Sequence, residues 1–428
     1  MNASLSTAIL RTDFFDFHAP PKPPTELPTP VRSSSSSHLS RTGVDNSTSL
    51  HDCQGREISK TDAPSRADGI KVPKVDNPKS SHRQTGGSIM KPTPVGIDIA
   101  KNVFQVHYVD EQTGEIISKQ IKRAKFLEFF ANRTECLIGM EACGGAHHWA
   151  RELIKLGHQV KLLPAQYVKA FNIRNKNDAA DARAIWLALQ QPSKPVAVKT
   201  PMQQAMLSLH RLREQLVKIR TMQINGLRGL LAEYGQVVGR GRASLTKAMP
   251  GLLGRLSAHL PAVLIESLRE QWAEIGRLDE RIGQIERRMR DWKKEDPAVN
   301  AILQIPGVGL LTATAAVATM GEAKAFRSGR EFAAWAGLVP RQSGTGGKTR
   351  LHGISKRGDT YLRKLLIHGA RSVLSHAKNP EPWVDRMKQR RPSNVVTVAL
   401  ANKMARTIWA VLAHGRAYQK GYVSVRPA

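Results

Sequence analysis

Two acidic residues lie in apolar surroundings, where their carboxylates could serve metal-dependent chemistry. Asp98 stands in the middle of the apolar strand pattern 95–99, and Glu141 directly follows the apolar segment 137–140. An ionised carboxylate in such a place is costly unless a cation or a hydrogen-bond donor compensates it. Glu141 is also expected at the carboxyl edge of a sheet, which is where α/β proteins place their sites.

Two further acids, Asp178 and Asp181, are spaced i, i+3, which puts both on one face of a predicted helix. Taken alone, each acid could be a helix cap or a surface charge. All four together would form a cage of oxygen ligands suited to Mg2+ or Mn2+. Two such ions, held roughly 4 Å apart, activate the attacking oxygen and stabilise the leaving oxygen in phosphoryl transfer.

The sequence Ile-Pro-Gly-Val-Gly at residues 305–309 precedes a predicted helix that starts near Leu310. This pattern is typical of a helix-hairpin-helix motif. Gly307 and Gly309 would let the backbone approach a phosphate, and the helix N-terminus would offer N–H groups to it. Such a contact binds the nucleic-acid backbone without reading its sequence. A simple tight turn is the alternative.

A basic, glycine-rich stretch spans residues 337–363, and its composition suits contacts with phosphates. Its candidate nucleic-acid-binding residues are Lys348, Arg350, Lys356, Arg357 and Arg363. Gly347-Lys348-Thr349 matches the end of a nucleotide-binding P-loop, but the first glycine of that motif would fall at Gln342, which excludes an ATPase. Ser343 lies among these cations and is a candidate nucleophile toward a phosphodiester, with a plain turn serine as the alternative.

The elements that must position these residues begin with a predicted mixed sheet. Apolar runs and turn residues predict strands at 95–99, 103–109, 115–121, 136–140 and 160–163. Helices are expected at 126–131, 146–156, around Tyr167 and at 179–189. Two hairpin connections followed by βαβ units give antiparallel strands on one side and parallel strands on the other, covered by helices. This is the order of an α/β RNase H-like fold.

Two long helices are predicted next, at 203–233 and 262–291, separated by a Gly-rich turn region from 235 to 254. Apolar residues recur in the second helix at spacings of four and three. They are Leu268, Trp272, Ile275, Leu278, Ile282, Ile285, Met289 and Trp292. The stripe predicts a coiled-coil hairpin or dimer stalk, or else an amphipathic helix packed within one domain. The last region, 302–417, is expected to be mostly helical, most clearly at 362–374 and 395–412.

The composition indicates a polyanionic partner, because 65 Lys and Arg against 35 Asp and Glu give a formal net charge of +30. Residues 1–89 are rich in Ser, Pro and Asn without apolar periodicity, which predicts a disordered leader, and Met90 could be a natural start. Neither a signal peptide nor a membrane span is expected, which favours the cytoplasm. Three cysteines form no disulfide framework or paired zinc motif, and Cys143 with His147 and His148 is only a weak metal pattern.

These residues together resemble the DEDD transposases of bacterial insertion sequences, a group that works with a structured guide, or bridge, RNA. The resemblance runs from Met90 nearly to the C-terminus. It rests on four segments, at Gly96 to Lys101, Met140 to Ala142, Asn177 to Ala182 and Trp335 to Pro340.

The resemblance implies an RNase H-like (RuvC-like) domain with metal-binding acids at Asp98, Glu141, Asp178 and Asp181, and a C-terminal transposase domain that supplies a nucleophilic serine. By motif this serine is Ser343, with Ser355 as a rival. It also implies dimers or higher oligomers in which one subunit's metal domain and another's serine domain form a composite site. The 89-residue leader departs from the family pattern.

The expected domains are a leader (1–89), an RNase H-like catalytic domain (90–199), a helical coiled-coil linker (200–297) and a mainly α transposase domain with the helix-hairpin-helix (298–428). The expected activity is excision and insertion of an element by metal-dependent DNA cleavage and rejoining, in which metal-bound carboxylates activate Ser343 for attack and a covalent serine–DNA intermediate forms. Two alternatives are a junction-resolving nuclease that uses metal-activated water, and a non-catalytic nucleic-acid binder, which would leave the acids unexplained.

Overall fold

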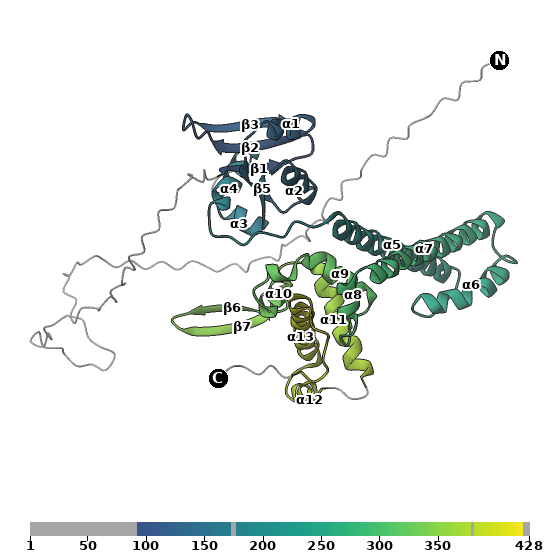
Figure 1. Cartoon of the computed structure of the whole chain (residues 1–428). Coiled ribbons are helices and arrows are strands. Elements are labelled where there is room, and N and C mark those ends of the chain that lie inside the picture. The colour runs from purple at the N-terminus through teal and green to yellow at the C-terminus, as the bar shows by residue number, and fades with distance from the viewer. Residues whose placement is uncertain (1–91, 173–176, 378–380, 423–428) are drawn as a thin grey trace, which may run out of the picture. The chain divides into compact units, whose positions relative to one another are not determined.

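The computed structural model describes residues 92–172, 177–377 and 381–422, and these are the residues discussed below (Figure 1). The predictions for the leader at 1–89 and for Met90 lie outside the described residues.

The N-terminal part contains the predicted mixed sheet. Its strands are β1 (Thr93–Ile99), β2 (Val103–Val109), β3 (Ile116–Lys122), β4 (Cys136–Glu141) and β5 (Gln159–Leu163), in the spatial order β3-β2-β1-β4-β5. β1 pairs antiparallel with β2, and β2 antiparallel with β3, whereas β1–β4 and β4–β5 are parallel. The strand order and directions confirm the expected mixed α/β sheet.

Alternation along the strands divides the sheet into two apolar faces. One face carries Val95 and Ile97 of β1 and packs against α1 (Phe126–Ala131) and α2 (Ala146–Lys155), where edge-to-face aromatic contacts fill the core. The other face receives α4 (Asp178–Leu189), which contacts β1, β2 and β4. The short helix α3 (Ala165–Lys169) joins β5 to this layer. The sheet is therefore covered by helices on both sides.

Three helices follow: α5 (Pro201–Glu233), α6 (Arg242–Leu256) and α7 (Ala262–Glu295). The prediction of a turn region at 235–254 is wrong over most of its length, because α6 occupies it. The glycines there suggested a loop, but α6 buries an apolar stripe that packs with α5 and α7. Such tertiary packing overrides the low helix propensity of glycine and of Pro250, which lies inside the helix.

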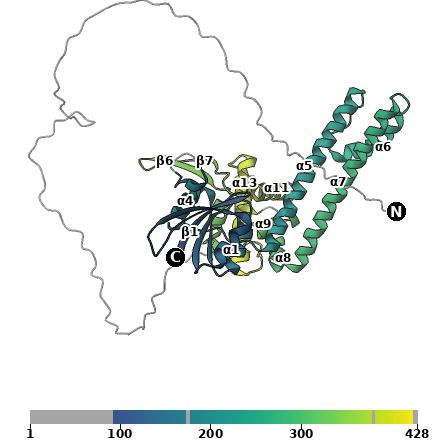
Figure 2. The ribbon, with the colours of Figure 1, turned by 90° about the horizontal axis from the view of Figure 1, so that it is seen from above.

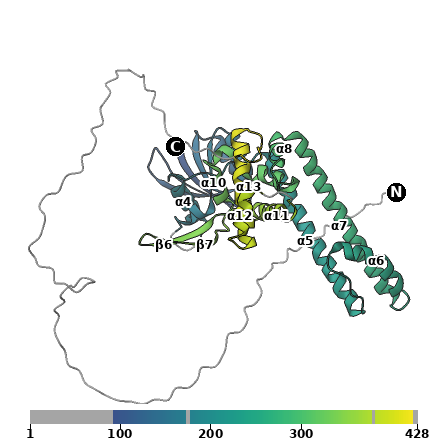
Figure 3. The same cartoon turned by 90° about the horizontal axis from the view of Figure 1, so that it is seen from below.

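α5 and α7 run antiparallel and side by side (Figure 2). Two ion pairs show the direction, because Arg213 pairs with Glu286 and Arg220, one to two turns later in α5, pairs with Asp279 earlier in α7. Residues of the predicted α7 stripe from Leu268 to Trp292 are buried, apart from the partly buried Trp272. The stripe packs within the same chain, against α5 and α6. At the C-terminal end of α7 it also packs against the helices that follow. Figure 3 shows α5 and α7 from below.

The C-terminal part is mainly helical, as predicted. Its helices are α8 (Pro297–Leu303), α9 (Leu310–Met320), α10 (Gly329–Trp335), α11 (Thr360–His376), α12 (Pro382–Lys388) and α13 (Ser393–His414). Among the described residues, α13 alone is long and apolar enough, by length and composition, to cross a membrane. It packs against α10 and α11 and contributes Leu400, Met404 and Ile408 to their shared core, which is the behaviour of a core helix.

Sequence analysis did not predict the hairpin of β6 (Pro340–Thr345) and β7 (Lys348–Ile354), which extends from α10 (Figure 1). Nearly every side chain on it is exposed, so it lacks the apolar alternation that marks most strands. The sequence did contain one signal for a hairpin, the Gly-Gly pair at residues 346–347. Gly346 and Gly347 form a two-residue loop with φ of 56° and 77°, and two left-handed residues are what the common type I′ hairpin turn requires.

Candidate active site

Asp98 and Glu141 lie next to each other at the carboxyl ends of the two central parallel strands. The β1–β4 register pairs Ile97 with Met140, so Asp98 and Glu141 occupy the next position on each strand. Neighbouring strands lie about 4.8 Å apart, and residues at matching register positions share a face of the sheet. The side chains of Val95 and Ile97 point to the opposite face, into the α1–α2 core. Asp98 and Glu141 therefore lie on the α4 side.

Two glycines let α4 lie directly on this face. A Cβ at Gly96 would lie 2.4 Å from the Ala182 carbonyl oxygen and 2.6 Å from the Trp186 backbone nitrogen. A Cβ at Gly139 would lie 3.1 Å from the Leu189 side chain. Glycine inside a strand often marks such a close approach. A glycine inside each of these two strands was therefore a signal in the sequence for a helix lying close to the sheet, but the sequence analysis did not predict this contact.

The N-terminus of α4 carries Asp178 and Asp181 in its first turn. The helix is capped by Asn177, whose side-chain oxygen accepts the backbone N–H of Ala180 at 2.7 Å. Asp178 is thus not the capping residue, which removes the helix-cap alternative for this acid, and its side chain is exposed. Asp181 accepts a hydrogen bond from the side-chain amide of Asn172.

Asp98 is close enough to the other three acids to be affected by their negative charge. The pKa of Asp98 is raised from 3.8 to about 6, first by burial and then by the negative charges of Asp181, Asp178 and Glu141, while the backbone N–H of Ile99 lowers it. Two of these acids also affect Cys143. Burial raises the pKa of the Cys143 thiol, and the negative charges of Glu141 and Asp98 raise it further. The structure therefore brings the four predicted acids into one neighbourhood.

The donor set fits a hard divalent cation. All four side chains are carboxylates, and the negative charges of three of them raise the pKa of the fourth, which is the charge that such a cation would offset. In the described part of the chain, no three of these or other His, Cys, Asp or Glu side chains converge to the distances of a closed metal site.

The weak pattern of Cys143, His147 and His148 forms no such group within the described residues. The His147 Nδ1 accepts the backbone N–H of Lys199 at 3.2 Å, and its Nε2 lies 3.3 Å from the Lys199 ammonium. The pKa of His147 is lowered to about 4 by burial and then by Lys199 and Arg151, which keeps the ring neutral. This histidine anchors the chain that leads into α5.

Ser343 lies on β6, with its hydroxyl exposed on the hairpin. The Ser343 Oγ is 2.7 Å from the Nε2 of His352 on β7, a contact that sequence analysis missed because no spacing rule links the two residues. Ser355 lies just beyond β7. Its backbone N–H donates to the Val339 carbonyl at 2.8 Å, and its Oγ accepts the Arg357 N–H at 3.5 Å, as in a turn.

Four of the predicted binding cations, Lys348, Arg350, Lys356 and Arg357, are exposed. The prediction for Arg363 needs correction, because this side chain is only 8 % exposed. Its guanidinium donates to the carbonyls of Ala336 and Arg357 and to the Thr360 hydroxyl, at 2.8 to 3.2 Å. Arg363 thus holds the turn after the hairpin and does not present its charge to a phosphate.

The turn between α8 and α9 has Gly307 at φ 84°. A Cβ at Gly307 would lie 2.8 Å from the Gly369 carbonyl of α11, and one at Gly369 would lie 2.1 Å from the Gly307 carbonyl. Close packing on α11 therefore requires glycine at Gly307. Gly309 is exposed at the N-terminus of α9, and it has open space around its Cα.

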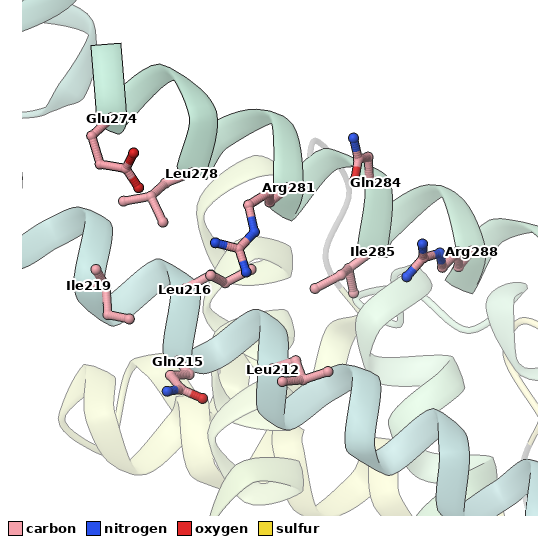
Figure 4. Close-up of a pocket in the computed structure, with 10 residues that line it drawn as sticks. All are labelled: Leu212, Gln215, Leu216, Ile219, Glu274, Leu278, Arg281, Gln284, Ile285 and Arg288. Carbon is pink, nitrogen blue, oxygen red and sulfur yellow. The ribbon is translucent and has the colours of Figure 1, made fainter. Parts of the chain in front are cut away.

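Two grooves lie in the helical parts. One of about 450 Å³ follows the seam of α5 and α7, where Leu212 and Leu216 of α5 face Arg281 and Ile285 of α7 (Figure 4). The other, of about 780 Å³, is lined by His352 and Ile354 of the hairpin together with Trp383 and residues of α13.

The mixed sheet, its acidic edge and the mainly helical region that follows define a protein of the DEDD, RNase H-like transposase class. Comparison with known proteins agrees. Residues 95–236 match a DEDD family described as "Transposase", and residues 299–384 match the "Transposase IS116/IS110/IS902 family".

The chain is 47% identical over 333 residues to a "Probable family 20 transposase" of Pseudomonas aeruginosa, covering 76% of this chain and 98% of that protein. It is 39% identical over 334 residues to the "Transposase for insertion sequence element IS1328" of Yersinia enterocolitica, covering 77% and 99%. For the transposase of IS1111A of Coxiella burnetii, the identity is 40% over 332 residues, covering 76% and 91%. This chain belongs to the IS110/IS116/IS902 family of DNA transposases.

Proposed function

We propose that the protein excises and inserts an insertion sequence by metal-dependent cleavage and rejoining of DNA. The observation that carries this proposal is the placement of Asp98 and Glu141 at matching positions of β1 and β4 on the face that α4 covers, with Asp178 and Asp181 in the first turn of α4. The pKa of Asp98, raised by burial and by the charges of Asp181, Asp178 and Glu141, supports it. These four residues would hold Mg2+ or Mn2+. The ions, when bound, would supply charge neutralisation at the reacting phosphate. The carboxylates themselves orient the ions, and α4 fixes two of them against the sheet.

Ser343 is the proposed nucleophile, and a covalent phosphoserine is the proposed intermediate. Its hydroxyl is exposed, lies among cations and contacts a histidine nitrogen that can accept a hydrogen bond. Ser355 is the weaker candidate, because its Oγ already accepts a turn N–H and its backbone is tied to Val339. A junction-resolving nuclease that uses water would need the four acids but neither serine.

The nucleic-acid partners of the proposed reaction are DNA ends, target DNA and a structured guide RNA. A net charge of +30 supports polyanionic partners, and the exposed Lys348, Arg350, Lys356 and Arg357 offer cations beside Ser343. The α8–α9 turn, with Gly309 exposed at a helix N-terminus, is the proposed helix-hairpin-helix contact to phosphate. Acting on DNA would place the protein in the cytoplasm.

We further propose that the protein acts as a dimer or higher oligomer, with a composite site formed by the acids of one subunit (90–199) and the serine of another (298–428). The helical segment 200–297 would be the coiled coil between them. The partly apolar seam groove of α5 and α7, with Leu212 51% exposed, is a surface that a second copy could cover.

The test uses a plasmid that carries the coding sequence with its native flanking DNA, and follows covalent protein–DNA complexes and strand exchange. Ser343→Ala should abolish both, whereas Ser355→Ala should retain them. If both serine variants still cleave and rejoin DNA normally, the serine mechanism is wrong and the junction-resolving nuclease is favoured. Asp98→Asn with full strand transfer in magnesium would instead favour a non-catalytic role for the acids.

A further inference from the structure

The contact between Ser343 and His352 has the geometry of a nucleophile with its base. The hairpin register pairs Ser343 with Arg350, so His352 lies two residues further along β7 on the same face. Diagonal neighbours across a strand pair are within reach of long side chains. The 2.7 Å distance between Ser343 Oγ and His352 Nε2 lies within the range of a hydrogen bond that transfers a proton.

No other group on the hairpin can take the serine proton. Residues 340–354 contain no Asp or Glu, and their cations are Arg341, Lys348 and Arg350. A charged guanidinium or ammonium has no acceptor site. Within the described residues, the Ser343 hydroxyl is also the only hydrogen-bond partner of the His352 ring. The chemistry of the hairpin thus leaves His352 as the acceptor.

We propose that His352 is the catalytic base that activates Ser343, an inference that rests on the proposed serine mechanism. The His352 Nε2 takes the proton of the Ser343 hydroxyl as Oγ attacks the phosphorus. The Oγ–P bond forms, and the bond from phosphorus to the leaving DNA oxygen breaks, with its electron pair staying on that oxygen. The departing oxygen takes a proton from solvent. In rejoining, the DNA oxygen attacks the phosphoserine, the Oγ–P bond breaks, and the imidazolium returns its proton to the Ser343 oxygen.

His352 is exposed on β7, so a free imidazole molecule can approach this position from solvent, which makes chemical rescue feasible. His352 also lines the groove of about 780 Å³ shared with Trp383 and α13. Removing the ring would enlarge this groove by the volume of an imidazole. A free imidazole molecule could then enter from solvent and reach the Ser343 hydroxyl.

The experiment measures the single-turnover rate of covalent protein–DNA formation on the plasmid described above, with the full-length protein. His352→Gln can still accept a hydrogen bond from Ser343 but is not a base. His352→Ala opens the space for added imidazole. His376→Gln, an exposed histidine at the end of α11, is the matched control. DNA affinity is measured for each variant to confirm that binding is intact.

A positioned base contributes about 10²- to 10⁴-fold, so both His352 variants should be slower by about that factor with unchanged DNA affinity. Added imidazole should restore a substantial part of the rate in His352→Ala and should leave Ser343→Ala and His376→Gln unchanged. The inference is overturned if His352→Gln reacts within a few-fold of the original protein, or if imidazole fails to rescue His352→Ala.

Failure of the inference can be told apart from failure of the serine mechanism. If Ser343→Ala is inactive while both His352 variants keep the normal rate, Ser343 remains the nucleophile and only the base is wrong. If Ser343→Ala keeps the covalent intermediate, the serine assignment fails, and the role of His352 fails with it.

Discussion

Replacing Asp98 by Asn should stabilise the metal-free N-terminal sheet at neutral pH. Asp98 carries a pKa of about 6 against 3.8, because burial and three neighbouring carboxylates disfavour its charged form. A shift of roughly two units corresponds to about 3 kcal/mol at 1.36 kcal/mol per unit, and solvent screening reduces this to about 1–2 kcal/mol. Asparagine fills nearly the same volume without the charge, so the variant should gain this free energy of unfolding.

The sign of the pH dependence follows from the direction of the shift. A carboxyl group with a raised pKa in the folded state binds more protons folded than unfolded between about pH 4 and 6. The destabilising contribution of Asp98 is therefore absent below about pH 4, grows through this window and is complete above about pH 6. The gain from Asp98→Asn should be near zero at pH 4 and full at pH 7.5.

Hydrogen exchange of the β1 and β4 amides in EDTA measures this local stability in the full-length protein. Magnesium should then protect the original protein, because binding to the folded state alone adds stability, and it should protect Asp98→Asn much less. Glu128→Gln, an exposed acid in a surface pair with Lys125, is the control and should change little. A destabilised Asp98→Asn, or an effect equal at pH 4 and pH 7.5, would refute the crowding of the four acids.

Three other predictions concern packing and binding. Gly96→Ala should destabilise the sheet by about 1–3 kcal/mol, because the new Cβ would force the α4 backbone away. Gly139→Ala should lower the stability less, because its Cβ would contact only the Leu189 side chain. Thermal unfolding of both variants tests this difference. Leu278→Ala, at 2% exposure in the α5–α7 seam, should lose about 2–5 kcal/mol in urea unfolding. Lys348→Ala should lower the slope of DNA affinity against salt by about 0.7–0.9, and an unchanged slope would remove this residue from the interface.

The strands of the sheet could be predicted to within about two residues. β1, β2 and β4 are buried and appear as short apolar runs, whereas β3 is mostly exposed and its start was marked by turn residues. β2 and α1 have the predicted bounds. The α6 segment could not be predicted in this way. Its Gly251, Gly254 and Pro250 favour a loop locally, and only contact with α5 and α7 makes the helix stable.

In the candidate site, too, some residues could be identified from the sequence, whereas their contacts could not. Asp98 and Glu141 could be selected from the sequence because charge inside an apolar run has a local signature. Arg363 was misjudged, because a buried arginine and a phosphate-binding arginine look the same in a basic stretch, and its carbonyl acceptors come from the fold. The pairing of Ser343 with His352 also needed the hairpin register.

By itself, the sequence determined the kinds of chemistry available: four carboxylates, a serine among cations, a large positive charge and the periodicities of a mixed sheet followed by helices. These are local properties, set by residue type and spacing along the chain. Only the tertiary structure decided which groups meet, through the glycines that bring α4 to the sheet and the turn that sets His352 against Ser343. Proximity between distant residues depends on packing and register, which no single segment specifies.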